Sequence, residues 1–204
     1  MGIKQRRERE RQEVRQSILV SAREIALQEG WQAVTMRKVA ERIEYSPPTI
    51  YEYFASKEAI LTELLHEGFR LLLIALQTAG TSSTDPEAQL MQMIGAYWHF
   101  ALQYPELYHV MHGQDGISFD CLDFPMEAEQ AFLLARSTLE VWARLNGVNI
   151  ADLDGAVEVI WGVLHGLVSL SMNGRISEGQ QRTRLLMEQT IYSLLRAWSV
   201  KKEV

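Results

Sequence analysis

The stretch TMRKVAERIEYSPPTIYEYFASKEAILTELL, residues 35–65, decides how the chain folds. Thr35 can cap a first helix, because its hydroxyl can accept a hydrogen bond from an N–H group that has no partner within the helix. We expect a three-residue turn at 44–46 and then a short second helix over about 46–54. One face of the first helix is apolar and carries Met36, Val39, Ala40 and Ile43.

Two adjacent prolines begin the second helix. A residue without an N–H loses nothing in a first helical turn, so Ser46 can be the cap and Pro47 and Pro48 the first two helical residues. Because a residue that precedes proline disfavours helical angles, we expect a slightly irregular first turn. Ile50 and Phe54 are four residues apart and can point into a small core. The outward face then holds Pro47, Pro48, Thr49, Tyr51, Glu52 and Tyr53.

Helix, turn and helix in this order predict a helix-turn-helix, with 46–54 as the recognition helix. The major groove of DNA is wide enough to admit one α-helix, and a short helix with a polar and aromatic outer face suits that groove. An ordinary helical hairpin is the alternative interpretation. Arg37 lies in the first turn of the helix that Thr35 caps, near a phosphate-facing end. Tyr53 and Lys57 flank the recognition helix, where their hydroxyl and ammonium groups can clamp phosphates, and such contacts position a protein on DNA.

The same residues closely resemble the DNA-binding domain of the tetracycline-repressor (TetR-like) family of bacterial regulators. The resemblance covers about residues 13–65. It implies an all-α fold of about nine helices, with an N-terminal three-helix head and a helical-bundle body. It also implies a homodimeric repressor that binds a palindromic operator and is released by a small ligand. The matching elements are Thr35, Val39, Ala40, Ser46, Thr49, Tyr51, Tyr53, Phe54, Ser56, Lys57, Glu58 and the leucines that follow.

The position of each residue in the motif implies its role on DNA. Phosphates would be held by Thr35, Arg37, Tyr53 and Lys57. Thr49 and Tyr51 would face bases or their adjoining backbone, and Pro48 would pack on thymine methyl groups. The expected set of DNA-contacting residues is completed by Lys38, Ser46 and Pro47.

Three positions depart from the family pattern. The family usually has glycine where this chain has Glu44, and a small apolar residue where it has Tyr45. Glycine suits a positive φ and glutamate does not, so either the turn has another shape or it tolerates strain. Glu52 stands where the family often has a larger or basic residue. It could accept a hydrogen bond from a cytosine amino group, but a carboxylate near phosphate is repelled, so we expect it to point away from DNA.

Charge is distributed unevenly along the 204 residues. The net charge is −6, yet residues 1–60 carry 11 Lys and Arg against 9 Asp and Glu, whereas residues 61–204 carry 9 against 17. An acidic body with a basic head fits a protein that contacts a polyanion at one end only. A solvated, frayed tail is the alternative for the basic segment, and we expect a flexible arm over 1–12.

Other classes of protein find little support in the sequence. No apolar run reaches the ~18 residues of a membrane helix, and the charged start lacks a signal-peptide core, so we expect a cytoplasmic protein. Cys121 is the single cysteine and allows no internal disulfide. No phosphate-binding glycine loop or nucleophile elbow is present, so we expect neither an enzyme nor a cofactor. The spacing of His99, His109, His112 and His165 forms no recognised metal-ligand set.

We divide the chain into a DNA-binding domain, residues 1–60, and a ligand-binding and dimerisation domain, residues 61–204. Helical periodicity runs through most of the second part, and alternating β patterns of useful length are absent. Helices are expected over about 56–79, 86–103, 105–113, 125–146, 151–173 and 178–199, with a glycine- and aspartate-bearing loop over about 114–124.

The last two predicted helices, 151–173 and 178–199, are the expected dimer interface. Trp161, His165 and Gly166 resemble the subgroup of the family with a Trp-His-Gly signature in its penultimate helix. Gly162 and Gly166 share one face, and small residues let a second helix approach closely, so a four-helix bundle across a two-fold axis is expected. A hydrogen-bonded core histidine is the favoured interpretation of His165.

Aromatic and methionine side chains concentrate in the second domain, and such a bundle can enclose an apolar ligand cavity. Plain core packing is the alternative for each of them. We expect the pocket between the 86–103 helix, the 105–113 segment and the helices within 125–173. Its predicted lining is Trp98, Tyr104, Tyr108, Met111, Trp142, Trp161 and His165. A transcriptional activator of the same fold, or a helical protein-interaction adaptor, remains an alternative to a repressor.

Overall fold

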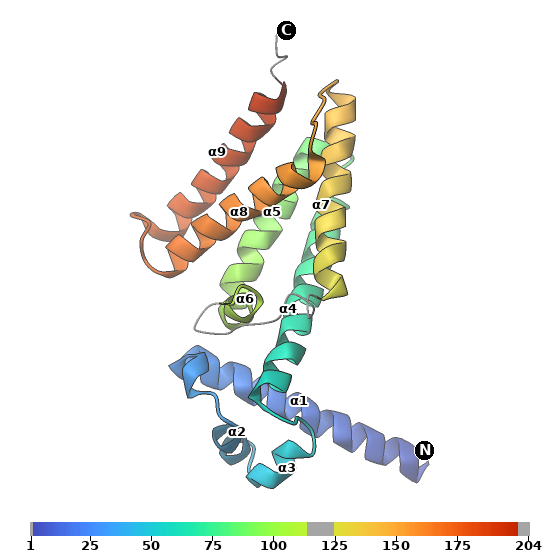
Figure 1. Ribbon diagram of the computed structural model, residues 1–204, viewed down its shortest axis with the longest axis vertical. Helices are drawn as coiled ribbons and strands as arrows, with labels where there is room; N and C mark the ends of the chain where they lie inside the picture. The colour runs from blue at the N-terminus through green and yellow to red at the C-terminus, as the bar shows by residue number, and fades with distance from the viewer. Residues whose placement is uncertain (1, 114–124, 200–204) are drawn as a thin grey trace. The chain divides into compact units, whose positions relative to one another are not determined.

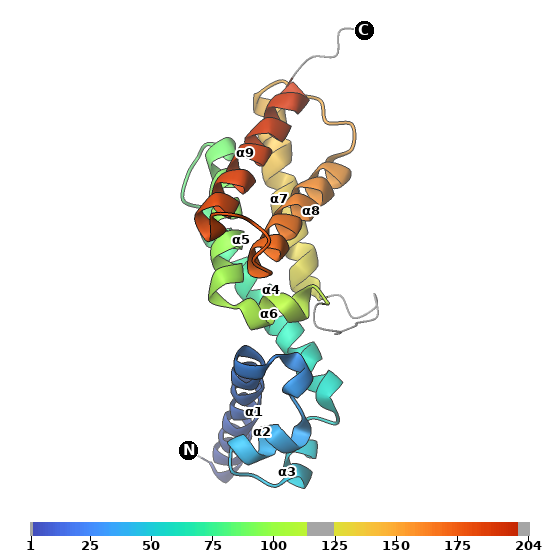
Figure 2. The same ribbon diagram turned by 90° about the vertical axis from the view of Figure 1, so that its left-hand side faces the viewer.

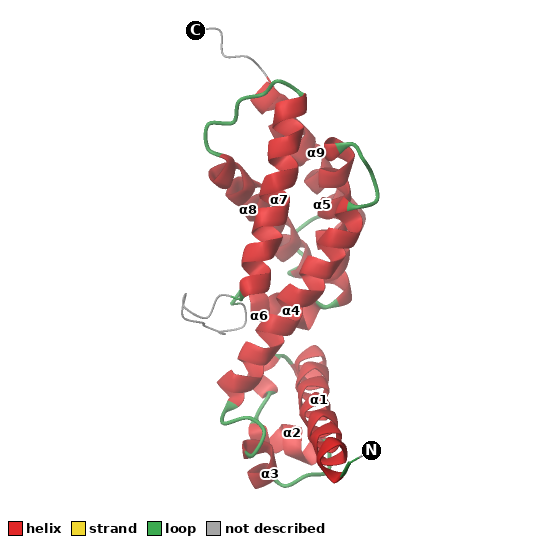
Figure 3. Cartoon of the chain, turned by 90° about the vertical axis from the view of Figure 1, so that its right-hand side faces the viewer, coloured by secondary structure: helices red, strands yellow, loops and turns green. Residues whose placement is uncertain are grey.

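The computed structural model describes residues 2–113 and 125–199, and these residues form nine α-helices and one 3₁₀ turn (Figure 3). The expected all-α class and helix number are therefore confirmed. The chain packs as two units: residues 1–68 and 104–125 form unit 1, and residues 69–103 and 126–204 form unit 2. The predicted loop at 114–124, with Cys121, lies outside the described residues.

Unit 1 contains α1 (Ile3–Glu29), the 3₁₀ turn η1 (Trp31–Ala33), α2 (Met36–Arg42), α3 (Pro47–Tyr51), the start of α4 (Lys57–Gly80) and α6 (Pro105–Met111). Gly30 ends α1 with a φ of 83°, a backbone angle that glycine adopts without steric cost. The helices surround one apolar core (Figure 1). Its most buried side chains include Ile18, Ala22, Ile25, Trp31, Val39, Ile50, Phe54, Leu64, Leu107 and Tyr108.

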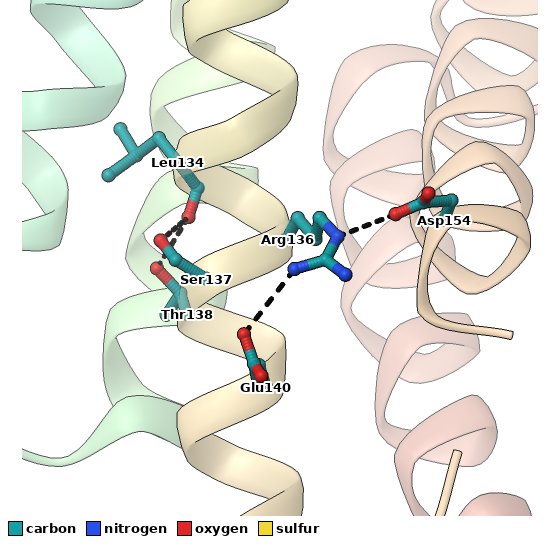
Figure 4. Close-up of polar contacts among 6 residues, drawn as sticks. All are labelled: Leu134, Arg136, Ser137, Thr138, Glu140 and Asp154. Carbon is teal, nitrogen blue, oxygen red and sulfur yellow. Dashed lines mark hydrogen bonds and ion pairs between the residues drawn. The ribbon is translucent and has the colours of Figure 1, made fainter. Parts of the chain in front are cut away.

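Unit 2 contains the rest of α4 and the helices α5 (Pro86–Gln103), α7 (Met126–Leu145), α8 (Leu153–Met172) and α9 (Gly179–Ser199). The helices α8 and α9 lie side by side and pack on α5 and α7 (Figure 2). A polar contact also joins α7 to α8. Arg136 Nε donates to Asp154 Oδ1 at 2.6 Å, and Arg136 Nη1 lies 3.4 Å from Glu140 Oε2 (Figure 4).

Two boundaries differ from the expected ones. The α1 helix begins at Ile3, whereas a flexible arm was expected over 1–12. The short α6 helix belongs to unit 1, whereas a division at residue 60 had assigned it to the ligand-binding domain. The sequence pattern of 105–113 shows an amphipathic helix but carries no information on which core its apolar face joins.

A charged cluster holds α6 on unit 1. Arg23 on α1 lies between two carboxylates, with Nη1 2.9 Å from Glu67 Oε1 and Nη2 2.7 Å from Glu106 Oε1. Its guanidinium also sits 5.5 Å from the centre of the Tyr104 ring. The indole of Trp31 donates to the backbone carbonyl of Glu106 at 3.1 Å. Because Glu106 is only 5 % exposed, its charge depends on Arg23 for compensation.

We expect Arg23→Met to lower the free energy of unfolding by about 3 kcal/mol, because it leaves the buried Glu106 carboxylate without its cation. Urea denaturation would measure the loss. The double variant Arg23→Met/Glu106→Met should recover part of it, since the most buried carboxylate is then gone and Glu67 alone is left without Arg23. Arg6→Met, which removes an exposed pair with Glu10, should cost less than about 1 kcal/mol. Equal losses in the single and double variants would contradict the assigned role of Arg23.

Candidate nucleic-acid interface and ligand pocket

The α2–α3 pair forms the predicted helix-turn-helix. Thr35 is the N-cap of α2, and its Oγ1 accepts a hydrogen bond from the Lys38 backbone N–H at 3.1 Å. Val39 of α2 and Ile50 of α3 are fully buried, and Phe54 just after α3 is almost so. These three side chains anchor the motif from within, which leaves the other face of α3 to solvent.

The α3 helix begins as the two prolines require, with Pro47 at its first position. Ser46 is the residue at the N-cap, but its side chain makes no capping bond to the backbone. Its Oγ instead lies 2.9 Å from Thr49 Oγ1. Tyr51 ends the helix and is 54 % exposed, and Pro48 is exposed as well. The outer surface of α3 therefore presents a proline, two hydroxyls and a phenol.

The predicted phosphate-binding residues differ in what their side chains contact. Arg37 is exposed and pairs with Glu41 one turn later at 2.8 Å, which raises its pKa. Lys38 forms an ion pair with Glu29. Lys57 differs most from the expectation, because its ammonium donates to the Trp31 carbonyl at 2.6 Å and burial lowers its pKa.

Arg15 fixes the chain just after the end of α3, a role that the sequence pattern did not indicate. Its Nη1 donates to the Tyr53 carbonyl at 3.2 Å and its Nη2 lies 2.7 Å from Glu63 Oε2. The guanidinium also lies 4.2 Å from the centre of the Phe54 ring. The spacing of α1 could have indicated this role, because Arg15 lies three residues before the buried Ile18 and therefore on the apolar side of the helix.

The turn between α2 and α3 has the regular shape of a helix C-terminus, with glutamate in place of glycine. Glu44 adopts a φ of 60°, and its N–H donates to the Glu41 carbonyl. The Tyr45 N–H donates to the Ala40 carbonyl at 2.9 Å, which completes a Schellman motif. The same pair of bonds follows α7 and α8, where Gly147 and Gly174 occupy the left-handed position. The turn thus keeps its shape, and Glu44 carries the strain.

Unit 2 contains an apolar cavity of about 80 Å³. It is lined by side chains from α4, α5, α7, α8 and α9, and no charged residue is among them. The tyrosine and tryptophan in this lining carry its only side-chain polar atoms. The lining is Phe69, Leu72, Leu76, Leu90, Met93, Ile94, Tyr97, Ala131, Phe132, Ala135, Val157, Ile160, Trp161, Leu164 and Ile191.

Of the seven predicted pocket residues, Trp161 lines this cavity. Tyr104, Tyr108 and Met111 belong to unit 1, because α6 packs there. Trp142 is buried and its indole donates to Glu87 Oε2 at 3.1 Å, so it ties α7 to the start of α5. The two others do not line the cavity either: Trp98 is a buried residue of α5, and His165 of α8 is half-buried, which lowers its pKa.

One face of α8 is apolar and uncovered. It carries Val159, Gly162, Val163, Gly166 and Leu170, spaced three or four residues apart. Val159 and Leu170 are exposed, and nothing described lies within 4 Å of a side chain built at either glycine. The helix as a whole is long and apolar enough to span a membrane, contrary to the expectation from the sequence, and 22 % of that span is buried.

Metal coordination finds no support in residues 2–113 and 125–199, since these hold no group of three or more His, Cys, Asp or Glu side chains placed to bind an ion.

A helix-turn-helix with one face of its second helix open to solvent, together with a helical bundle around an apolar cavity, defines the class of helix-turn-helix DNA-binding regulators. Residues 18–64 match the model of bacterial regulatory proteins of the tetR family, and residues 90–194 match the tetracyclin repressor-like C-terminal domain. The chain belongs to the tetR family. The Trp-His-Gly subgroup suggested by Trp161 and His165 stays a prediction.

Relatives of known role include both repressors and an activator. The chain is 34 % identical over 95 residues to the transcriptional repressor KstR of Mycolicibacterium smegmatis, which covers 47 % of this chain and 44 % of that protein. It is 25 % identical over 108 residues to the transcriptional activator FasR of the same organism, covering 53 % and 49 %. The chain thus spans about half the length of the curated relatives it matches.

Solved structures share the fold over nearly the whole chain. A Rhodococcus sp. RHA1 protein of unknown function superposes with a TM-score of 0.79 at 19 % identity, covering 91 % of this chain and 95 % of that one. The regulator FadR of Bacillus subtilis, solved in complex with stearoyl-CoA, superposes with a TM-score of 0.72 at 17 % identity, covering 88 % and 97 %.

Glu44→Gly should raise the free energy of unfolding by about 0.5–1 kcal/mol. Glycine removes the cost of a left-handed side chain, which exceeds the backbone entropy that it adds to the unfolded state. Glu44→Val should lower stability, because a β-branched residue fits that conformation worse. Chemical denaturation of the three proteins should give the highest free energy of unfolding with Gly at position 44, a lower one with Glu and the lowest with Val. A glycine variant less stable than the parent would show that the carboxylate makes a compensating contact.

Proposed function

We propose that the protein is a homodimeric transcriptional repressor of the cytoplasm, which binds a palindromic operator and is released by a small apolar effector. The outward face of α3 carries this proposal. Pro48, Thr49 and Tyr51 present methylene, hydroxyl and phenol groups, while Ile50 of α3 and Phe54 just after it hold the helix to the core. A surface of that kind suits base edges in a major groove.

Phosphate contacts would come from the residues that surround α3. Arg37 and Lys38 lie at the N-terminal turn of α2, where the unpaired N–H groups beside the Thr35 cap also favour an anion. Both cations are paired with nearby carboxylates on exposed surfaces, and such pairs cost little to exchange for phosphate. Lys57 holds the Trp31 carbonyl, so its role is to fix the start of α4 beside the motif.

A dimer through α8 and α9 would cover the uncovered apolar face. Val159, Gly162 and Gly166 form a flat row that a second helix can approach closely. On α9, Leu185 and Tyr192 are likewise exposed. Four such helices around a two-fold axis bury these side chains without a membrane.

The cavity in unit 2 supports an apolar effector. Its lining offers no charged group, so it would reject an ionised headgroup and accept a hydrocarbon portion. Its volume of about 80 Å³ is well below the ~300–1,000 Å³ of a ligand pocket. A ligand must therefore displace lining side chains, among them Phe69 of α4. Since Glu67, two residues earlier on the same helix, pairs with Arg23 of unit 1, α4 can carry that displacement to the DNA-binding unit.

An activator is the second candidate, because FasR, one of the relatives, is a transcriptional activator. The same α3 surface would serve either role. What separates them is the position of the operator relative to the promoter that it controls.

Tyr51→Ala and Thr49→Ala should each weaken binding to the operator at least tenfold, because each removes an outward group of α3 while Ile50 keeps the helix on the core. The probe is a duplex selected from a randomised pool by the parent protein, and fluorescence anisotropy measures the affinity. Sedimentation should show that both variants keep the dimer. Unchanged affinity in both would reject α3 as the recognition helix.

Ala131→Leu should abolish release from DNA by long-chain acyl compounds while leaving operator binding intact. Three added carbon atoms would occupy much of the cavity, which Ala131 lines from α7. The measurement is operator release on addition of a fatty acid or of stearoyl-CoA, the ligand in the B. subtilis FadR structure. Leu133→Met, at an exposed position of the same helix, is the control. Equal release from both variants would place the effector elsewhere.

A further inference from the structure

The first three turns of α1 stand clear of the core of unit 1. Residues 4–13 are all exposed, whereas Ile18, Ala22 and Ile25 farther along the same helix are fully buried. In Figure 1 the N-terminal half of α1 runs past α3. Their helical form continues the packed half of a 27-residue helix and does not by itself require a partner. The ten residues nevertheless leave a long surface open to one.

The charges of this segment are distributed unevenly around the helix, although Glu8 lies on the same side as the cations described next, four residues after Lys4 and three before Arg11. With 3.6 residues per turn, Lys4, Arg7, Arg11 and Arg15 form one row, which we call the basic row. The opposite face holds equal numbers of acids and bases, Arg6, Arg9, Glu10 and Glu13. Arg6 pairs with Glu10 there at 2.8 Å. Like charges one turn apart destabilise a helix by about 0.2–0.5 kcal/mol per pair, and Glu8 alone offsets part of this cost within the row, so a further anion facing the row would stabilise it.

The basic row is directed toward the end of the recognition helix. Arg11 lies 6.0 Å from the centre of the Tyr53 ring, and Arg15 holds the Tyr53 carbonyl. Arg7 and Arg11 line a hollow together with Tyr53, and two carboxylates, Glu10 and Glu52, balance their charges there. The next hollow along the helix is more basic, because Lys4, Arg7 and Arg11 line it with a single carboxylate, Glu8. Within the described residues, no ion pair joins a carboxylate to Lys4, Arg7 or Arg11.

We propose that the basic row binds the sugar-phosphate backbone of DNA that flanks the sequence read by α3. From Lys4 to Arg15 the row rises about 16 Å along the helix, and duplex DNA carries one charge per about 1.7 Å of its axis. Arg11 and Arg15 of the row contact Tyr53, which lies two residues after the end of α3, so the row and α3 can engage one duplex. This inference rests on the proposed operator binding, which it extends beyond the bases that α3 contacts.

The test compares two double variants of equal charge in the full-length protein. Lys4→Gln/Arg7→Gln removes two charges from the row, and Arg6→Gln/Arg9→Gln removes two from the opposite face. Affinity for the selected duplex is measured over 50–300 mM salt. The row variant should lower the slope of log K against log salt by about 0.9 for every phosphate that the protein no longer neutralises, close to 2 per protomer. The control should keep the parental slope, and circular dichroism should show equal helix content.

A second measurement lengthens the duplex. The parent and the control should bind more tightly when five flanking base pairs are added at each end, and the row variant should gain nothing. Equal slopes for both double variants, or an equal gain for all three proteins, would overturn the proposal. If the protein prefers the selected duplex but the row variant keeps the parental salt slope, DNA binding by the basic row is rejected and the operator function stands. If DNA binding depends on salt and on the basic row but shows no sequence preference, the operator function is rejected and the role of the row stands. If the protein does not bind DNA at 50 mM salt, both are rejected.

Discussion

The α3 helix has five residues and cannot hold itself in place, because a helix of that length is unstable alone. The orientation of α3 therefore depends on what lies behind it. Ile50 and Phe54 enter the core, and Arg15 of α1 fixes the chain where the helix ends, through the Tyr53 carbonyl and the face of the Phe54 ring. The pair of prolines contributes from the other end by fixing two φ angles before folding. Every outward group of α3 takes its direction from these anchors.

The assignment of α6 to unit 1 gives α4 a double role. Its first half pairs with Arg23 through Glu67, and a side chain at Gly68 would collide with Met111 of α6, whose Sδ lies 2.6 Å from the position of an added Cβ. The next residue, Phe69, lines the cavity of unit 2. Of three consecutive residues of one helix, Glu67 thus makes an ion pair, Gly68 allows a close helix crossing and Phe69 lines an apolar cavity.

Rules of helix capping and helix periodicity predicted most of the features that depend on hydrogen bonds between residues close in sequence. The cap at Thr35, the start of α3 at Pro47 and the helix that begins near Ser56 all follow from hydrogen-bond needs within a few residues. Contacts between residues distant in sequence could not be predicted from these rules. Lys57 finds a carbonyl 26 residues away, and Tyr108 joins the core of unit 1 instead of the predicted pocket. The motif itself implied the turn at Glu44, but only the backbone shows that bonds to Glu41 and Ala40 keep its shape without glycine.

Net charge is a poor guide to where this protein can meet a polyanion. Interactions between exposed charges fade beyond about 10 Å at 0.1 M salt, so a phosphate senses the groups beside it and not the total of −6. On α1 the decisive quantity is the order of residues. Exchanging Arg7 with Glu10 would put a carboxylate into the basic row while the composition stayed unchanged. The helical form of the segment is therefore what converts a mixed run of charges into one positive edge next to Tyr53.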